Sequence, residues 1–239
     1  MRLAVISDIH GNLTALEAVI ADLRETSPDL ILHGGDLPAG GARPAEIVDR
    51  MRALGWNGVL GNTDEMLFRP ESLTEFAARA PHLRKLFDAI AEMAVFTREA
   101  LGAERIAWLR NLPMTQSTDA VALVHASIEN TWVSPGTNAT DDELDATYRT
   151  LGTRIAVYAH IHQPFVRSIG PRIVANTGSV SLSYDGDPRA SYLLVDEGSV
   201  TIRRVECDLA AEVAALKASG LPHADWVAQT LRQASFVMP

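Results

Sequence analysis

Residues of metal-binding types recur along the chain, each group directly after a short apolar run. We interpret the apolar runs as β-strands. In open α/β sheets, the loops that follow successive strands converge at one edge of the sheet, where ligands bind. The runs cover residues 3–6, 30–32, 59–60, 121–124 and 155–158, and the polar groups read SDIHGN, GGD, GNTDE, VHAS and AHIH. The pattern predicts a metal centre at the strand ends, formed by Asp8, His10, Asp36, Asn62, His125, His160 and His162.

The spacing of these residues indicates how they would share ions. Asp8 and His10 are separated by one residue, so in an extended segment both side chains would point toward the same cation. His160 and His162 have the same spacing, although each could serve a different ion, and the two oxygens of Asp36 could bridge two ions. Oxygen and imidazole donors without thiolate suit Mn, Fe, Ni or Zn. Two such ions, about 3.5–4 Å apart, clamp the attacking and leaving oxygens in phosphoryl transfer, with a bridging hydroxide as the nucleophile.

The first half of the chain must position three of these groups. Strand and helix signals alternate over residues 1–60, as in βαβ units. Asn12 is a candidate N-cap for an amphipathic helix that ends before Pro28, and a second helix is expected over residues 44–54. Residues 65–112 carry helical patterns without strands, at 73–79, 83–97 and 104–109. We expect this segment to be an insertion beside the site that shapes the substrate pocket.

The second half is rich in strands. A hairpin is expected over residues 114–125, followed by a helix over 141–151. Short antiparallel strands are then expected at 165–169, 173–175, 191–195 and 200–205, with helices at 208–219 and 223–234. No linker rich in Pro or Ser divides the sequence. We therefore predict one domain over residues 1–239, with C-terminal helices in 208–239.

Composition restricts the class of protein. A chain of 239 residues with 47% hydrophobic residues is long enough for one sizeable core. Its single cysteine, Cys207, cannot form an internal disulfide, and no apolar run approaches the roughly 20 residues of a membrane span. We therefore expect a cytoplasmic protein. The net charge of −9 argues against nonspecific nucleic-acid binding, which depends on cationic contacts with phosphate.

The ordered series DxH, GD, GNxD, H and HxH resembles that of the calcineurin-like metallophosphoesterase superfamily over residues 1–205. The later stretch AHIHQP…NTGSV resembles its small bacterial phosphodiesterases. The resemblance implies two mixed β-sheets packed as a sandwich, flanked by helices, with a dinuclear site. It assigns one ion to Asp8, His10, Asp36 and His162, and the other to Asp36, Asn62, His125 and His160, with Asp36 as the bridge.

The departures from the family pattern are informative. Much of the superfamily has GNH where this chain has Gly61, Asn62 and Thr63. That histidine is thought to protonate the leaving oxygen or to hold the phosphate, and a threonine has no suitable pKa for the proton transfer. Loss of general-acid assistance is typically worth 10² to 10⁴-fold in rate. Chemistry should therefore persist for leaving groups that depart without a proton. The other changes, at Ala126, Ala159, Ile161 and Thr177, are small and lie beside retained ligands.

Several roles stay open at the level of sequence. Asn62, His125 and Asp64 are the candidate catalytic residues, although Asp64 could orient a catalytic side chain or cap the helix that begins at Glu65. His33 precedes GGD and is expected to pack or hydrogen-bond locally; it is also the first substitute proton donor to test.

We expect a metal-dependent phosphoesterase, and a phosphodiesterase is the preferred interpretation. The enzyme would use two divalent ions, with Mn as the first candidate. Its partner would be a small phosphorylated substrate, with a nucleotide as one candidate; a homo-oligomer is compatible with the sequence. The alternatives are a phosphomonoesterase, a dinucleoside polyphosphate hydrolase, or a noncatalytic scaffold such as the retromer subunit of this fold.

Overall fold

The computed structural model describes residues 1–239. The first of its two mixed sheets has three parallel strands at one side. The strand order is β10-β9-β1-β2-β3, in which β1, β2 and β3 are parallel and β9 is antiparallel to both β1 and β10. The strands are β1 (Leu3–Ile6), β2 (Leu30–His33), β3 (Asn57–Gly58), β9 (Ala190–Asp196) and β10 (Ser199–Val205). The third strand was predicted at residues 59–60 and instead ends at Gly58, so the ligand loop that follows it is longer.

The second mixed sheet has the order β4-β5-β6-β8-β7. Its strands are β4 (Thr115–Ser117), β5 (Val121–Val124), β6 (Ile155–Tyr158), β7 (Phe165–Ile169) and β8 (Arg172–Asn176). The expected hairpin is present as the antiparallel pair β4 and β5. The expectation that β8 pairs only with antiparallel neighbours is confirmed on one side of the strand and wrong on the other. Strand β8 pairs antiparallel with β7 but parallel with β6, because it lies between the two.

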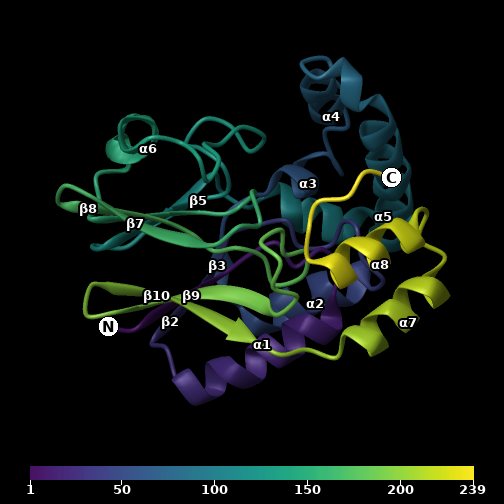
Figure 1. Ribbon diagram of the computed structural model, residues 1–239. Coiled ribbons are helices and arrows are strands. Elements are labelled where there is room, and N and C mark those ends of the chain that lie inside the picture. Colours follow the sequence, from purple (N-terminus) through teal and green to yellow (C-terminus); the bar gives the residue numbers. More distant parts are fainter.

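The two sheets pack face to face, with helices on their outer faces (Figure 1), as the fold class predicted from sequence requires. The helices are α1 (Leu13–Thr26), α2 (Pro44–Leu54), α3 (Asn62–Glu65), α4 (Glu71–Ala77), α5 (Arg84–Arg110), α6 (Asp141–Tyr148), α7 (Leu209–Ser219) and α8 (Ala224–Gln233). Short 3-10 turns cover Pro81–Leu83 and Arg149–Leu151. None of the helices combines the length and the hydrophobicity that a membrane-spanning segment requires.

Apolar burial explains this layering. Val5, Leu32 and Leu123 belong to the cluster between the sheets, and Leu16 and Ile47 to the cluster under α1 and α2. Asn12 caps α1 as expected, since its Oδ1 accepts a hydrogen bond from the amide of Ala15 at 2.9 Å. Helix α1 therefore begins directly after the first metal-binding loop.

The helical insertion is part of the main core. Phe87, Ala94, Leu101 and Leu109 of α5 are buried in the same cluster as α1 and α2. The two helices expected at 83–97 and 104–109 both lie within α5, which is interrupted at Gly102 (φ 67°, ψ 175°), where the absence of a Cβ permits a positive φ. Removing the insertion would expose the core, so its role must be tested by point substitutions.

The C-terminal helices pack against the same insertion helix. Met93 of α5 is buried together with Val213 and Leu216 of α7 and Val227 and Leu231 of α8. Helices α5, α7 and α8 accordingly form one group at the side of the sheets that bears the C-terminus (Figure 1).

Candidate metal centre

The predicted ligands follow five strands, three from the first sheet and two from the second. Asp8 and His10 follow β1, Asp36 follows β2, and Asn62 follows β3; His125 follows β5, and His160 and His162 follow β6. The sequence pattern was expected to place them at the edge of one sheet. The loops instead meet at the shared carboxyl ends of both sheets, because the sandwich brings the two sets of parallel strands together.

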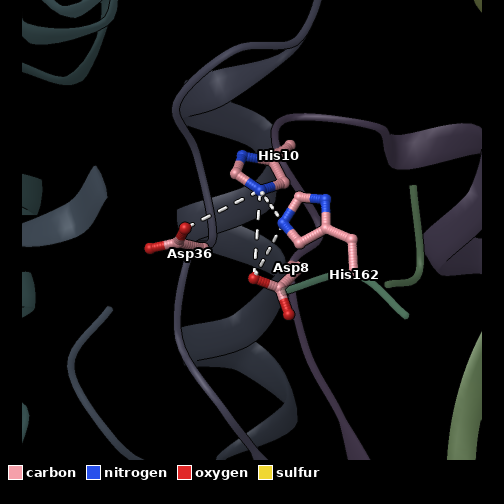
Figure 2. A group of neighbouring side chains, drawn as sticks. All are labelled: Asp8, His10, Asp36 and His162. Atoms are coloured by element: carbon pink, nitrogen blue, oxygen red, sulfur yellow. Dashed lines mark hydrogen bonds and ion pairs between the residues drawn. The ribbon is translucent and has the colours of Figure 1, made fainter. Parts of the chain in front are cut away.

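Four side chains form the first donor group (Figure 2). The ligand atoms of Asp8, His10, Asp36 and His162 all lie within 4.8 Å of one another, and all four residues are buried. His162 Nε2 lies 3.2 Å from Asp8 Oδ1 and 3.2 Å from His10 Nε2. His10 Nε2 lies 3.7 Å from Asp36 Oδ2. Such a compact set of nitrogen and oxygen donors matches the chemistry of a divalent transition ion.

A second donor group lies on the other side of Asp36. Asn62 Oδ1 is 2.8 Å from His125 Nε2 and 2.9 Å from His160 Nδ1. His125 Nε2 is also 3.6 Å from Asp36 Oδ1. Asp36 therefore presents Oδ2 to the first group and Oδ1 to the second, as a bridging carboxylate would.

Hydrogen bonds to backbone carbonyls fix the orientation of three imidazoles. The Nδ1 atoms of His10, His125 and His162 lie 2.7–2.8 Å from the carbonyl oxygens of Ala39, Gly34 and Leu182. An Nδ1 that donates to a carbonyl leaves the lone pair on Nε2, which in each case faces the donor group. His160 differs, because it turns Nδ1 toward Asn62.

Asp8 supplies the test of whether a cation fits. This residue is fully buried, yet neither carboxylate oxygen has a hydrogen-bond partner. Burial alone would raise the pKa of Asp8, but the imidazoles of His162, His125 and His10 outweigh burial and hold this pKa well below its usual range. A buried anion without partners is costly unless it is paired or binds a metal. The residues present therefore fit a metal ion.

The histidines are suited to ligation to different degrees. Burial, with help from the neighbouring His125, lowers the pKa of His160 to about 4, and burial also lowers the pKa of His10. A lowered pKa favours the neutral imidazole, which is the form that binds metal. Burial acts to lower the pKa of His125, but the nearby carboxylates of Asp36 and Asp8 raise it overall. A cation bound at His125 would displace that proton.

The backbone of the ligand loops is not extended. Asp8, His10, Asp36, His160 and His162 all have positive φ angles, between 46° and 70°. The expectation that the DxH and HxH segments point their side chains together by extended alternation was therefore wrong. Residues with positive φ place these side chains at the donor groups instead. Left-handed backbone at a non-glycine residue costs of order 1–3 kcal/mol and is concentrated at functional sites.

The buried carboxylate of Asp64 forms hydrogen bonds with two of the ligand loops. It accepts hydrogen bonds from the amides of Asp36, Leu37 and Gly61 at 2.9–3.0 Å. Burial and the nearby Asp36 raise the pKa of Asp64 to about 7, while the amides of Leu37 and Gly61 oppose that rise. The side chain is fully buried and does not line the cavity beside the ligands. It also caps α3, and its contacts are those of a positioning residue.

Gly61 lets the same two loops approach each other. A Cβ atom at this position would lie 2.1 Å from Asp36 Oδ1, which is inside van der Waals contact. The neighbouring amide of Thr63 donates a hydrogen bond of 2.9 Å to that oxygen.

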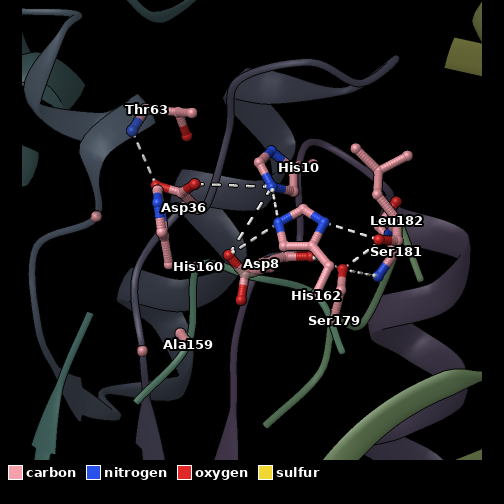
Figure 3. Close-up of polar contacts among 12 residues, drawn as sticks. Asp8, His10, Asp36, Thr63, Ala159, His160, His162, Ser179, Ser181 and Leu182 are labelled. Carbon is pink, nitrogen blue, oxygen red and sulfur yellow. Dashed lines mark hydrogen bonds and ion pairs between the residues drawn. The ribbon is translucent and has the colours of Figure 1, made fainter. Parts of the chain in front are cut away.

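A loop after β8 supports the first donor group (Figure 3). Ser179 Oγ donates to the carbonyl of Asp8 at 2.8 Å and accepts the amides of Ser181 and Leu182. The carbonyl of Leu182 in turn holds His162. This loop contains the NTGSV segment, and its hydrogen bonds connect Asp8 to His162 through the backbone.

A cavity of about 180 Å³ opens directly on the donor groups. Thr63 lines it, at the position that the family histidine would occupy. The cavity is also lined by Tyr184, Trp226 and Phe236. These three residues were not identified from the sequence, because only tertiary packing brings them to the metal loops. His33 is fully buried, does not line this cavity, and makes no side-chain hydrogen bond. It packs as expected but is in no position to act as a proton donor.

Comparison with known proteins identifies the family. A sequence model described as the calcineurin-like phosphoesterase superfamily domain matches residues 1–199. The chain belongs to this superfamily. An uncharacterized protein of Methanocaldococcus jannaschii is 30% identical to it, over 96% of each chain. The crystal structure of a metallophosphoesterase from Sphaerobacter thermophilus has a TM-score of 0.78 and 27% identity, over 98% of this chain and 99% of that one.

A more distant relative has a more specific name. A probable cyclic nucleotide phosphodiesterase of Synechococcus is 24% identical, over 84% of this chain and 94% of that protein. Membership of the calcineurin-like phosphoesterases supports a hydrolase that acts on small phosphate esters, and the buried Asp and His cluster fits the divalent ions of that family.

Proposed function

We propose that this calcineurin-like protein is a metal-dependent phosphodiesterase that uses two divalent transition ions, with Mn the first candidate. The observation that carries the proposal is the position of Asp36, whose two oxygens lie 3.7 Å from His10 Nε2 and 3.6 Å from His125 Nε2. The ions, when bound, would supply an activated water for attack on phosphorus and would stabilise charge on the phosphate oxygens.

The chain's own residues have distinct roles in this proposal. Asp8, His10 and His162 would hold the ion of the first group, while Asn62, His125 and His160 would hold that of the second. Asp64 positions the loops of Asp36 and Asn62 through three backbone amides. Asn62 lines the cavity beside the second group, whereas His125 lies buried behind it; we retain both as candidate catalytic residues.

Charge around the cavity favours a diester as the substrate. Neither an arginine nor a lysine lines the cavity beside the donor groups. A phosphate diester carries one negative charge, whereas monoesters and polyphosphates carry more and need further cationic partners. The name of the Synechococcus relative agrees with a diester and makes a nucleotide one candidate. The buried Asp8 carboxylate, whose oxygens have no hydrogen-bond partner and face imidazole nitrogens, supports metal binding over a purely structural, protein-binding role.

Turnover of a diester and a monoester with the same aryl group tests the proposal. Protein loaded with Mn should hydrolyse bis(4-nitrophenyl) phosphate with a higher kcat/KM than 4-nitrophenyl phosphate. Asp36→Asn should abolish both activities, and Asp88→Asn, an exposed change on α5, should leave them unaltered. A higher kcat/KM for the monoester would assign a phosphomonoesterase instead. Absence of turnover on both, with both ions bound, would refute an esterase.

A further inference from the structure

The cavity beside the donor groups has two chemically different sides. One side carries His10, Asp36, Asn62, His160 and His162. The remaining lining is mostly apolar and is called here the apolar wall, whose principal members are Leu86, Ile90, Met93, Trp226, Val227 and Phe236. A phosphate on the polar side would place an attached group against this wall.

Two helices and the C-terminal tail build the apolar wall together. Leu86, Ile90 and Met93 lie on α5, and Trp226 and Val227 lie on α8. The family match ends at residue 199, so α8 and the tail lie outside the part of the chain that carries the shared chemistry. The part of the apolar wall that α8 and the tail contribute is therefore placed to select among substrates of a common reaction.

Hydrogen bonds hold the tail in place beside the cavity. Trp226 Nε1 donates to the carbonyl of Val237 at 2.7 Å, and the amide of Gly186 donates to the carbonyl of Ala234 at 2.9 Å. Phe236 lies between these two anchors and is 50% exposed. These two anchors place its ring at the cavity.

Aromatic rings connect the apolar wall to the metal ligands. Tyr184 stacks on His162 with ring centroids 4.6 Å apart and an interplanar angle of 26°. Phe236 contacts the same tyrosine edge to face, at 5.8 Å. Aromatic surfaces in these geometries favour a further ring over a flexible alkyl chain.

The size of the cavity and the charge of its lining restrict the class of substrate. A cavity of about 180 Å³ is smaller than the roughly 300–1,000 Å³ of sites that enclose a drug-sized ligand. The absence of arginine and lysine disfavours a second phosphate, as in a dinucleoside polyphosphate. Building on the proposed function, we propose that the substrate is a monoanionic phosphate diester, one ester group of which is a single aromatic ring seated against the apolar wall.

Binding of two non-hydrolysable phosphinates tests this specificity. Methyl(phenyl)phosphinate and dimethylphosphinate carry the same single charge and differ only in the ring. Titration calorimetry with Mn-loaded protein should show about 10- to 100-fold tighter binding of the phenyl compound, because the ring buries apolar area on the wall. Equal affinities of the two phosphinates would overturn the proposal.

A matched pair of tail variants locates the effect. Phe236→Ala should lower the affinity for the phenyl compound about three- to tenfold and leave that for dimethylphosphinate unchanged. Met238→Ala, at a residue of similar exposure (45%) that does not line the cavity, should change neither affinity. Melting curves should be alike for both variants, because both side chains are half exposed. Equal effects of the two substitutions would show that Phe236 does not contact the ring, and would overturn the assignment of the tail to the binding site.

The binding experiment separates this inference from the proposed function. Hydrolysis of aryl diesters together with equal phosphinate affinities would overturn the apolar wall as a selective surface and leave the phosphodiesterase intact. A preference for the phenyl phosphinate without turnover of any diester would retain aromatic recognition and refute the reaction.

Discussion

Asp64 Oδ2 accepts a hydrogen bond of 2.9 Å from the backbone amide of Asp36, the residue that lies between the two donor groups. The same oxygen accepts the amide of Gly61, at the start of the Asn62 loop. One buried carboxylate thereby sets the relative position of ligands that follow two different strands.

The substitution Asp64→Asn should weaken metal binding without removing a ligand. An amide nitrogen placed against the backbone N–H groups would break at least one of the three hydrogen bonds and shift the loops. Loss of such a supporting contact typically reduces metal affinity 10- to 100-fold. Competition with a chromogenic chelator measures the affinity, and Asp88→Asn, on the surface of α5, is the matched control. Unchanged Mn affinity in Asp64→Asn would show that the loops hold their geometry without this carboxylate.

Asp36→Asn and His160→Ala should differ in the number of ions lost. Asp36 faces both donor groups, whereas His160 contacts only the second. We expect elemental analysis to find about two ions per chain in the wild type, about one in His160→Ala and fewer than one in Asp36→Asn. If Asp36→Asn retained both ions, Asp36 would be no bridge.

Thr63→His should help poor leaving groups selectively. Thr63 lines the cavity and has no proton of suitable pKa, so rates should fall steeply as the pKa of the leaving group rises. An imidazole at this position would supply general-acid assistance worth up to about 10² to 10⁴-fold for alkyl diesters, with little effect on nitrophenyl esters. The measurement is a plot of log kcat/KM against leaving-group pKa for both proteins. A flat plot for the wild type, with chemistry rate-limiting, would mean that another group already donates the proton.

His33→Leu should reduce the sensitivity of the fold to acid. Burial lowers the pKa of His33 from its ordinary 6.5 to about 4. Between these values the unfolded chain binds a proton that the folded chain excludes, so the free energy of unfolding falls as pH falls from about 6.5 to 4.

A leucine removes this linkage and leaves no unpaired ring nitrogen in the core. The slope of the free energy of unfolding against pH should decrease by up to about 1.4 kcal/mol per pH unit in that window. Urea titrations with a chelator present measure it, with His82→Gln as a control for loss of an exposed imidazole. Parallel pH profiles for wild type and His33→Leu would contradict the assignment.

The candidate donor set could be located from sequence because each of its residues lies within four residues after a short strand. Asp8 and His10 follow β1 at once, and Asp36 follows β2, so strand prediction and ligand prediction support each other. The fold class followed from the same alternation together with the family resemblance.

The remaining features depend on contacts between distant segments. Trp226 and Phe236 lie more than 160 residues beyond Asn62 in the sequence, and only the packing of α8 on α5 brings them to the cavity. The positive φ of Asp8 and His10 was missed for a different reason. Positive φ is uncommon for any non-glycine residue, even though Asp and His adopt it more often than most, and the loop's hydrogen bonds hold it here.

The anchored tail has a consequence for how the protein is handled. The two ends of the chain lie on opposite sides of the molecule (Figure 1), and Phe236 already contacts the cavity. Any fusion after Pro239 therefore emerges next to the metal loops. A polyhistidine tag at that end would add imidazoles close to the ions, so metal content and inhibition would report on the tag as well as on the enzyme. A tag before Met1 avoids this interference.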